Sequence, residues 1–445
     1  MNQVDLSSAC SLAEKVNNGE VTAVSAVKAC LENIYKSADL NNFITVCEGE
    51  ALEAAERVDT DVKNGKRGML AGVPIAVKDN ICCRGIKTTC ASRIMSDFVP
   101  DFDAEVILRL KRAGAVIVGK TNMDEFAFGS ANEYSAYGAV KNARDKTRVA
   151  GGSSGGSANA VAAGQVALAL GTDTGGSVRQ PAAYCGVVGL KPTFGAIEKK
   201  GVIGMCPSLE QVGTISKSCD DAALLFSVLS GRDIPRTLDG IIAGKTIGVA
   251  AEFINSEMSE EMKTAFFGAV ETLKALGAKI AEVSVPSFPF GLAAYHVLSS
   301  AVAVNSFKRV FKQHAQTELL GDEVKRRLFT GAVMLSGDNY DDLYIKAAKV
   351  RTVIKCDYDN ALNCCDALLC PTSSHAATKV GEVIDPHKGH MCDSFLAPVS
   401  LAGLPAVSVP FGSENSLPLG VQIIGRRNAE FDILNIGTAL TTASK

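Results

Sequence analysis

The sequence predicts an α/β fold in which a mixed β-sheet lies between layers of helices. Residues 51–65 have a helical pattern, whereas the apolar run at 72–79 is continuous and typical of a buried strand. Residues 103–114 predict a second helix ending at a glycine, and 115–121 a short strand rich in β-branched residues. Because helices and strands alternate, we expect the α/β class.

The second half of the chain continues this alternation. Ser259 can cap a helix over 259–277, with Met262, Phe266, Ala269, Leu273 and Leu276 on its buried face. The further expected elements are a strand at 278–286, a helix at 340–365 and strands at 366–371, 405–410 and 418–425. Since neither an internal repeat nor a linker is apparent, we expect a single domain over residues 1–445.

Composition limits the possible functions. With 445 residues, 47% of them hydrophobic and 21% charged, the chain is typical of a soluble globular protein. Its net charge of −3 gives it no general attraction for a polyanion, so another subunit is expected to hold any nucleic acid. The absence of a secretory start and of a long uninterrupted apolar run predicts a cytoplasmic protein without a membrane segment. Its 14 cysteines lack C-x-x-C spacing and are expected to be buried thiols.

Two segments rich in serine and glycine, 150–160 and 171–181, lie close together in the sequence. A flexible linker is one interpretation, but the Ala- and Val-rich residues 157–173 predict a helix followed by a buried strand. A phosphate-binding loop is a second interpretation, but the lysine that such a loop requires is missing. A serine nucleophile is the third interpretation, and it requires a base.

Lys78 is the candidate base because it follows a continuous apolar strand. All five histidines lie in the last third of the chain, which disfavours a Ser-His-Asp arrangement without excluding it. Lowering a lysine pKa from about 10.4 to about 7 by burial requires roughly 4 to 5 kcal/mol. From the local sequence alone, a structural ion pair between Lys78 and a carboxylate remains an alternative.

Three segments resemble the defining blocks of the amidase signature family: GVPIAVKDN, GGSSGGSANAVAAG and GTDTGGSVRQPAAYCGVVGLKPT. Two serines in them stand 24 positions apart, as in that family. The resemblance implies the family's fold and a Ser-Ser-Lys triad, with Ser177 as nucleophile, Ser153 as bridging serine after a cis peptide bond, and Lys78 as base. It also implies that the backbone N–H groups of Thr174, Gly175, Gly176 and Ser177 hold the oxyanion.

The neighbouring polar residues are expected to have structural roles. Ser154 and Ser157 would fix the glycine-rich turn, and Asp173 and Arg179 would form a local pair. On this resemblance, the catalytic core occupies about 65–220, and a region for the substrate pocket and partner contacts about 290–425.

Within the family, segments such as 119–138 and 321–331 resemble the glutaminase subunits of tRNA-dependent amidotransferases. This resemblance implies that the chain hydrolyses glutamine and supplies ammonia to partner subunits, B and C. ATP and Mg²⁺ would belong to the partner, charged tRNA would bind mainly through it, and this chain would need no cofactor. A stand-alone amidase and a scaffold without activity are the alternatives.

By the same resemblance, Arg327 would bind the α-carboxylate of glutamine, Asp393 its ammonium group, and Tyr295 would line the pocket. A solvated helix face, a helix cap and a core position, respectively, are the alternatives for these residues. The chain departs from the family pattern at 299–316, at Ala150 and at Thr214. His387, His390, Cys392 and Asp393 could ligate a metal, but a solvated loop is the preferred interpretation and no metal is expected.

Overall fold

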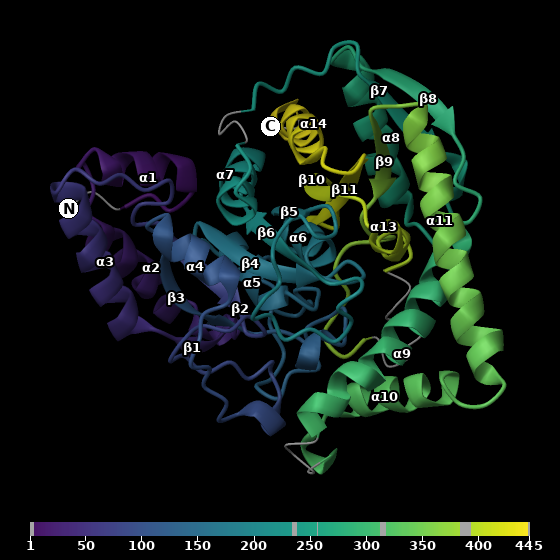
Figure 1. Cartoon of the computed structure of the whole chain (residues 1–445). Coiled ribbons are helices and arrows are strands. Elements are labelled where there is room, and N and C mark those ends of the chain that lie inside the picture. The colour runs from purple at the N-terminus through teal and green to yellow at the C-terminus, as the bar shows by residue number, and fades with distance from the viewer. Residues whose placement is uncertain (1–3, 234–237, 256, 312–316, 383–392, 444–445) are drawn as a thin grey trace.

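The computed structural model describes residues 4–233, 238–255, 257–311, 317–382 and 393–443 (Figure 1). Within these ranges all strands belong to one sheet of eleven, in the order β1-β3-β2-β4-β6-β5-β10-β11-β9-β7-β8. The strands are β1 (Phe43–Val46), β2 (Pro74–Lys78), β3 (Val116–Thr121), β4 (Leu168–Asp173), β5 (Val188–Lys191), β6 (Gln211–Ser216), β7 (Thr246–Ala250), β8 (Lys279–Val283), β9 (Ala367–Pro371), β10 (Ala406–Glu414) and β11 (Leu417–Gly425).

Helices surround this sheet and extend beyond it on one side (Figure 1). They are α1 (Ala9–Asn17), α2 (Ala23–Lys36), α3 (Glu48–Lys63), α4 (Glu105–Arg112), α5 (Gly155–Ala162), α6 (Arg179–Cys185), α7 (Cys219–Ser230), α8 (Glu260–Ala275), α9 (Gly291–Phe311), α10 (Asp322–Met334), α11 (Lys346–Asn363), α13 (Ala397–Ala402) and α14 (Glu430–Ala443). The α/β class predicted from the sequence is confirmed.

The sheet is mixed, as expected. Strand β2 runs parallel to β3 and β4, and β7 runs parallel to β8 and β9, while the other neighbouring pairs are antiparallel. The C-terminal strands β10 and β11 lie between β5 and β9. The last part of the chain therefore joins the N-terminal strands to the β7–β9 group.

Helices cover both faces of the sheet. Gly420 of β11 faces Ala183 of α6, whereas Ile423, three positions further along the same strand, faces Gly437 of α14. Because alternate residues of a strand point to opposite faces, α6 and α14 lie on opposite sides. Helix α5 contacts α6, and α7 and α8 contact α14, which gives the two layers that the sequence predicted.

Most predicted elements are present, with shifted ends. The helix predicted at 51–65 begins earlier, at Glu48, and Ser259 caps α8 by accepting a hydrogen bond from Met262 N–H. Leu276 is a correction: it is 37% exposed rather than on the buried face, because it follows the last helical residue of α8. The helix predicted at 340–365 consists of a π-helical stretch over Tyr340–Ile345 and then α11.

Among the described residues, one helix is long and apolar enough to cross a membrane, judged by its length and composition alone. The helical segment is Phe288–Lys308, and 44% of an apolar 18-residue window within it is buried inside the structure. Its helix, α9, packs against α10, α11 and α13. A core helix of a soluble protein satisfies the same test, so this observation is weak support for a membrane segment.

Candidate active site

The three candidate catalytic residues meet at one edge of the sheet. Lys78 ends β2, and the segment carrying Ser177 begins directly after β4. Because β2 and β4 are parallel neighbours, their carboxyl ends lie side by side. Ser153 reaches the same edge because it directly precedes the turn that opens α5, which packs on both strands.

Lys78 is fully buried and contacts hydroxyl groups. Its Nζ lies 2.8 Å from Ser153 Oγ and 3.1 Å from Thr172 Oγ1. Burial lowers the pKa of Lys78 to about 8, although the negative charges of Glu210, Asp124 and Asp173 oppose the shift. Within the described residues no carboxylate forms an ion pair with Lys78. The alternative of a structural ion pair is therefore wrong, and the neutral amine is a minor but substantial form near physiological pH, far more populated than in an ordinary lysine.

The two serine-rich segments are joined through the backbone. The Gly152–Ser153 peptide bond is cis, as the resemblance implied, and Ser154 N–H donates to the Ser177 carbonyl oxygen at 3.1 Å. Ser153 is buried, whereas Ser177 is half-buried. The Ser177 hydroxyl has no hydrogen-bond partner within the described part of the chain. The structure thus contains the Lys78–Ser153 link of the expected relay but not a hydrogen bond between the two serine hydroxyls.

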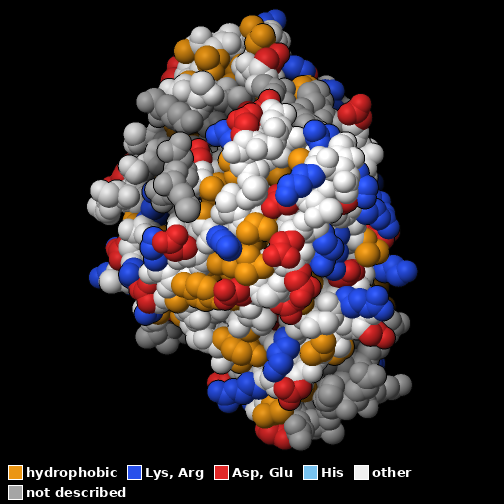
Figure 2. All heavy atoms as spheres, turned by 90° about the vertical axis from the view of Figure 1, so that its left-hand side faces the viewer, with side chains coloured by type: hydrophobic (Ala, Val, Ile, Leu, Met, Phe, Trp, Pro, Cys, Tyr) orange, Lys and Arg blue, Asp and Glu red, His pale blue; other side chains and the backbone are white. Residues whose placement is uncertain are grey.

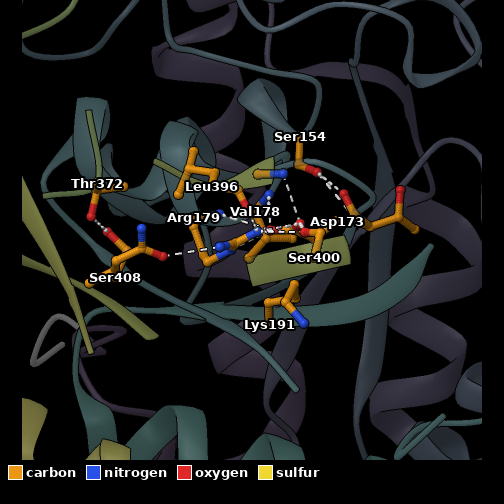
Figure 3. Close-up of polar contacts among 12 residues, drawn as sticks. Ser154, Asp173, Val178, Arg179, Lys191, Thr372, Leu396, Ser400 and Ser408 are labelled. Atoms are coloured by element: carbon orange, nitrogen blue, oxygen red, sulfur yellow. Dashed lines mark hydrogen bonds and ion pairs between the residues drawn. The ribbon is translucent and has the colours of Figure 1, made fainter. Parts of the chain in front are cut away.

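A buried ion pair holds the segment that carries Ser177. Arg179 Nε and one terminal nitrogen each donate to the Asp173 carboxylate at 3.0 Å, as Figure 3 shows. Asp173 also accepts hydrogen bonds from the N–H groups of Gly176 and Val178. Burial raises the pKa of Asp173, but the charge and hydrogen bonds of Arg179 outweigh it and bring the pKa below its ordinary value. The predicted local pair is confirmed.

Arg179 also ties this segment to the C-terminal part of the chain. Its guanidinium donates to Gln422 Oε1 at 3.0 Å, to Ser400 Oγ at 2.9 Å and to the Leu396 carbonyl at 3.2 Å (Figure 3). The loop after β4 therefore has its position fixed by residues more than 200 positions away in the sequence.

The expected oxyanion donors are only partly available. The N–H of Gly176 is already used, since it donates to Asp173 at 2.9 Å. Gly176 also has φ +136°, and a side chain there would collide with Leu396. Thr174, Gly175 and Ser177 remain the candidates from the predicted set.

The other polar residues of the two serine clusters support the turn. Ser154 Oγ donates to the Thr172 carbonyl at 3.2 Å, and Ser157 Oγ to the Leu170 carbonyl at 2.9 Å, so both bind the backbone of β4 as expected. Asp124 packs directly against Gly152, where a Cβ would lie 2.1 Å from its Oδ2. The loop after β3 thereby closes over the backbone before Ser153.

Of the three predicted substrate residues, Tyr295 contacts the loop after β4, and the charges of the other two reach Tyr295. The Tyr295 ring lies against Gly175, where a Cβ would come within 2.4 Å of Tyr295 Cζ. Burial raises the pKa of Tyr295; the charge of Arg327 opposes this shift and that of Asp393 adds to it. Both charges therefore act on the tyrosine hydroxyl. Residues 385–392 of the possible metal-binding loop, including His387, His390 and Cys392, lie outside the described residues.

Arg327 belongs to a charged cluster on α10. It is 5% exposed, its Nε lies 2.8 Å from Glu323 Oε1, and a terminal nitrogen lies 2.8 Å from His296 Nδ1. Glu323 also binds the guanidinium of Arg326 through two contacts of 2.7 Å. Arg327 is thus not on a solvated helix face, which was the alternative.

Sequence reasoning missed several polar groups at this site: Thr172, Glu210, His296 and Glu323. The spacing of Glu323 and Arg327, four positions apart on one helix, predicts their pairing and was available in the sequence. Thr172 lies in the same sequence block as Ser177, five positions before it, whereas Glu210 and His296 come from segments that no local pattern places beside the site.

Comparison with known proteins decides the family. A family model described as Amidase matches residues 25–434. The chain belongs to the amidase family. It is therefore an amidase signature enzyme, and the Ser-Ser-Lys triad is a feature of that family.

Among curated relatives, this amidase is 43% identical over 449 residues to a glutamyl-tRNA(Gln) amidotransferase A subunit (number 2) of Clostridium acetobutylicum, covering 93% of this chain and 94% of the relative. It is 44% identical over 430 residues to the corresponding A subunit of a Synechococcus species, covering 90% and 84% of the two chains.

Solved structures of the family agree. The glutamyl-tRNA(Gln) amidotransferase A subunit from Thermotoga maritima is 39% identical to this chain with a TM-score of 0.81. The match covers 96% of this chain and 93% of the Thermotoga chain. A structure described as an amidase is 31% identical with a TM-score of 0.90, covering 98% and 100% of the two chains. The amidase signature fold is therefore established for this chain.

The pKa of about 8 for Lys78 predicts the pH dependence of amide hydrolysis. Because only the neutral amine accepts a proton, kcat/KM should rise with pH through about 8 and should fall about 50-fold between pH 8 and pH 6. Ammonia release measured across this range tests the prediction, and Lys78→Met should abolish activity.

Lys191 supplies the control, since burial lowers the pKa of this second lysine to about 7 while its Nζ donates to the Pro192 carbonyl. Lys191→Met should leave the acidic limb in place, that is, the rise of kcat/KM with pH through about 8. A limb that moves in this variant would contradict the assignment of the titration to Lys78.

Proposed function

We propose that this chain is the glutamine-hydrolysing subunit of a tRNA-dependent amidotransferase. It releases ammonia that a partner subunit uses to convert Glu-tRNA(Gln) to Gln-tRNA(Gln) in an ATP-dependent reaction. The observation that carries the proposal is the buried Lys78 amine, 2.8 Å from Ser153 Oγ, in a chain about 40% identical to relatives named for that reaction.

The proposed chemistry is acyl transfer through a serine ester. Neutral Lys78 takes a proton from Ser153 while Ser153 takes one from Ser177, whose oxygen attacks the side-chain amide carbon of glutamine. The N–H groups of Thr174, Gly175 and Ser177 stabilise the oxyanion of the tetrahedral intermediate. The proton returns from Lys78 through Ser153 to the leaving nitrogen, and ammonia departs. Water then attacks the glutamyl ester while Ser153 and Lys78 take its proton, and that proton passes to Ser177 Oγ as glutamate leaves.

The charged cluster on α10 suits the α-carboxylate of glutamine. Glu323 carries one negative charge against the positive charges of Arg326 and Arg327, so the cluster has a net charge of about +1. One bound carboxylate would neutralise it. Asp393, 8% exposed, would pair with the α-ammonium group, and Tyr295 would form the wall between them and the loop after β4.

The proposal includes a heterotrimer with subunits B and C in the cytoplasm. ATP and Mg²⁺ would bind to the partner, which would also hold most of the charged tRNA, and this chain would bind no cofactor and no membrane. Its net charge of −3 supports this division of roles. Figure 2 agrees for one face: Lys and Arg are interspersed there with Asp and Glu rather than gathered into a basic area. The chain would act as one domain.

Replacing the nucleophile should abolish glutaminase activity without unfolding the chain. Ser177→Ala removes the attacking oxygen, so ammonia release from glutamine should fall by at least about 10⁴-fold, with an unchanged circular dichroism spectrum. Ser157→Ala is the matched control, since this hydroxyl bonds Thr121 and Leu170 rather than the triad, and it should keep most of the activity. Substantial activity in the Ser177 variant would refute the assignment.

Removing the Arg327 charge should impair glutamine binding selectively. Arg327→Met should raise KM for glutamine by about 10- to 100-fold, because a charge-assisted hydrogen bond contributes about 1.5 to 3 kcal/mol. Hydrolysis of a simple aliphatic amide without a carboxylate should change far less, and Arg326→Met should have a smaller effect on glutamine. Equal losses on both substrates would indicate a structural role for Arg327.

Assembly distinguishes the proposed glutaminase within a complex from a stand-alone amidase, the alternative suggested by the departures at 299–316. Similarity to amidotransferase relatives over most of the chain does not favour that alternative. Affinity-tagged chain should co-purify with subunits B and C when the three are expressed together, and charged tRNA with ATP should stimulate ammonia release. A chain that stays alone and is equally active without partners would overturn the proposed membership of a complex.

A further inference from the structure

We propose that Glu210 is a positioning residue for the reaction, acting through Thr172 and Asn80 to hold Lys78 and to stabilise the ammonium form that Lys78 takes when it accepts a proton. The inference rests on the proposed role of Lys78 as the base. It extends the proposed relay of Ser177, Ser153 and Lys78 by three further groups, Thr172, Asn80 and Glu210.

The sheet brings Glu210 to the site from a different strand. Glu210 directly precedes β6, and the antiparallel register pairs the next residue, Gln211, with Asp173 at the end of β4. Continuing this register puts Glu210 opposite Thr174 and on the face of the sheet that Thr172 shares, two positions away. Glu210 is 2% exposed and Thr172 is 1% exposed, so the carboxyl group is held away from solvent.

Thr172 connects the carboxyl group to the amine. Its Oγ1 accepts from Lys78 Nζ at 3.1 Å and from Asn80 Nδ2 at 3.2 Å. Because both lone pairs of this oxygen are then used, its own hydrogen is left to donate, and the Thr172 side chain lowers the pKa of the nearby Glu210 carboxyl group. Asn80 closes the arrangement by donating to Glu210 Oε1 at 3.4 Å.

The backbone fixes the position of the carboxyl group. A Cβ on Gly204 would lie 1.8 Å from Glu210 Oε2, so this glycine permits a close approach that other residues would block. Glu210 is thus held between Gly204 on one side and the Asn80 and Thr172 side chains on the other.

The groups facing Lys78 are Glu210, Asp124, Asp173 and Cys90. Asp173 is neutralised by Arg179, and burial raises the pKa of Asp124 to about 7 and that of Cys90 well above its ordinary value. Glu210 has the largest favourable effect on the Lys78 ammonium among them, although burial raises its own pKa too. Its other charged neighbour is Lys199.

A base that is buried away from water needs a nearby negative charge to stabilise its protonated form. When Lys78 takes a proton from Ser153, an ammonium ion forms where water cannot solvate it. The Glu210 charge lowers the energy of that ion, and the Thr172 oxygen orients the amine toward Ser153. An acid plays the same part when it orients a catalytic histidine.

The test is the pH dependence of Ser177 labelling by a fluorophosphonate, which reports the relay independently of glutamine and of partner subunits. Removing the negative charge in Glu210→Gln should move the acidic limb down by about 1 to 3 pH units, because a nearby opposite charge raises a lysine pKa by that amount. The weaker base should also lower the plateau rate by about 10- to 100-fold.

Two further variants separate charge from packing. Glu210→Asp keeps the charge and should keep the limb within about half a unit of the wild type. Glu430→Gln is the control, since this equally buried acid holds Thr193 N–H and Arg232 and does not face Lys78. It should leave both limb and plateau unchanged.

A folded Glu210→Gln protein with an unshifted acidic limb and a normal plateau rate would overturn this inference and would leave the proposed function standing. If that variant does not fold by circular dichroism, Thr172→Val decides instead: removing the hydroxyl should lower the plateau at least about tenfold, and an unchanged rate would overturn the inference. Wild-type protein that is not labelled at Ser177 at any pH would overturn the proposed function and this inference with it.

Discussion

The buried ion pair between Asp173 and Arg179 is the interaction on which the candidate site depends. It fixes the loop after β4, because the Asp173 carboxylate accepts two backbone N–H groups of that loop while Arg179 compensates its charge. Removing one partner of a buried pair typically destabilises a protein by about 3 to 5 kcal/mol, since the other charge is left in the interior. The loop that carries Ser177 therefore has little freedom except at its half-buried serine hydroxyl.

Three buried lysines differ in the groups that their amines contact, and these contacts determine which of them can act as a base. Lys120 forms an ion pair with Asp79 at 3.3 Å, and Lys191 donates to a backbone carbonyl. Lys78 instead meets the hydroxyls of Ser153 and Thr172, without an ion-pair partner in the described structure. Burial lowers its pKa, while carboxyl groups at a distance limit that shift, so the amine exchanges a proton near pH 8.

Much of the fold followed from local sequence because helix caps, glycine stops and continuous apolar strands are local signals. The family blocks placed Lys78, Ser153 and Ser177, and the structure brings their segments together. Contacts between remote segments were not predictable: nothing near Arg179 indicates that it binds Gln422, and nothing near Gly175 indicates that the Tyr295 ring covers it. Glu210 was missed for the same reason, since only the pairing of β6 with β4 brings it to the end of β4 that carries Thr172.

The central position of β10 and β11 has a consequence during protein synthesis. Residues 78, 153 and 177 leave the ribosome long before residues 406–425, which join the two halves of the sheet and supply Gln422 to Arg179. A growing polypeptide thus holds all three residues of the triad without the strands that fix their surroundings. Prematurely terminated chains are left with two unjoined groups of strands and without the Gln422 contact that helps to hold Arg179, so the surroundings of the triad are complete only when translation is almost finished.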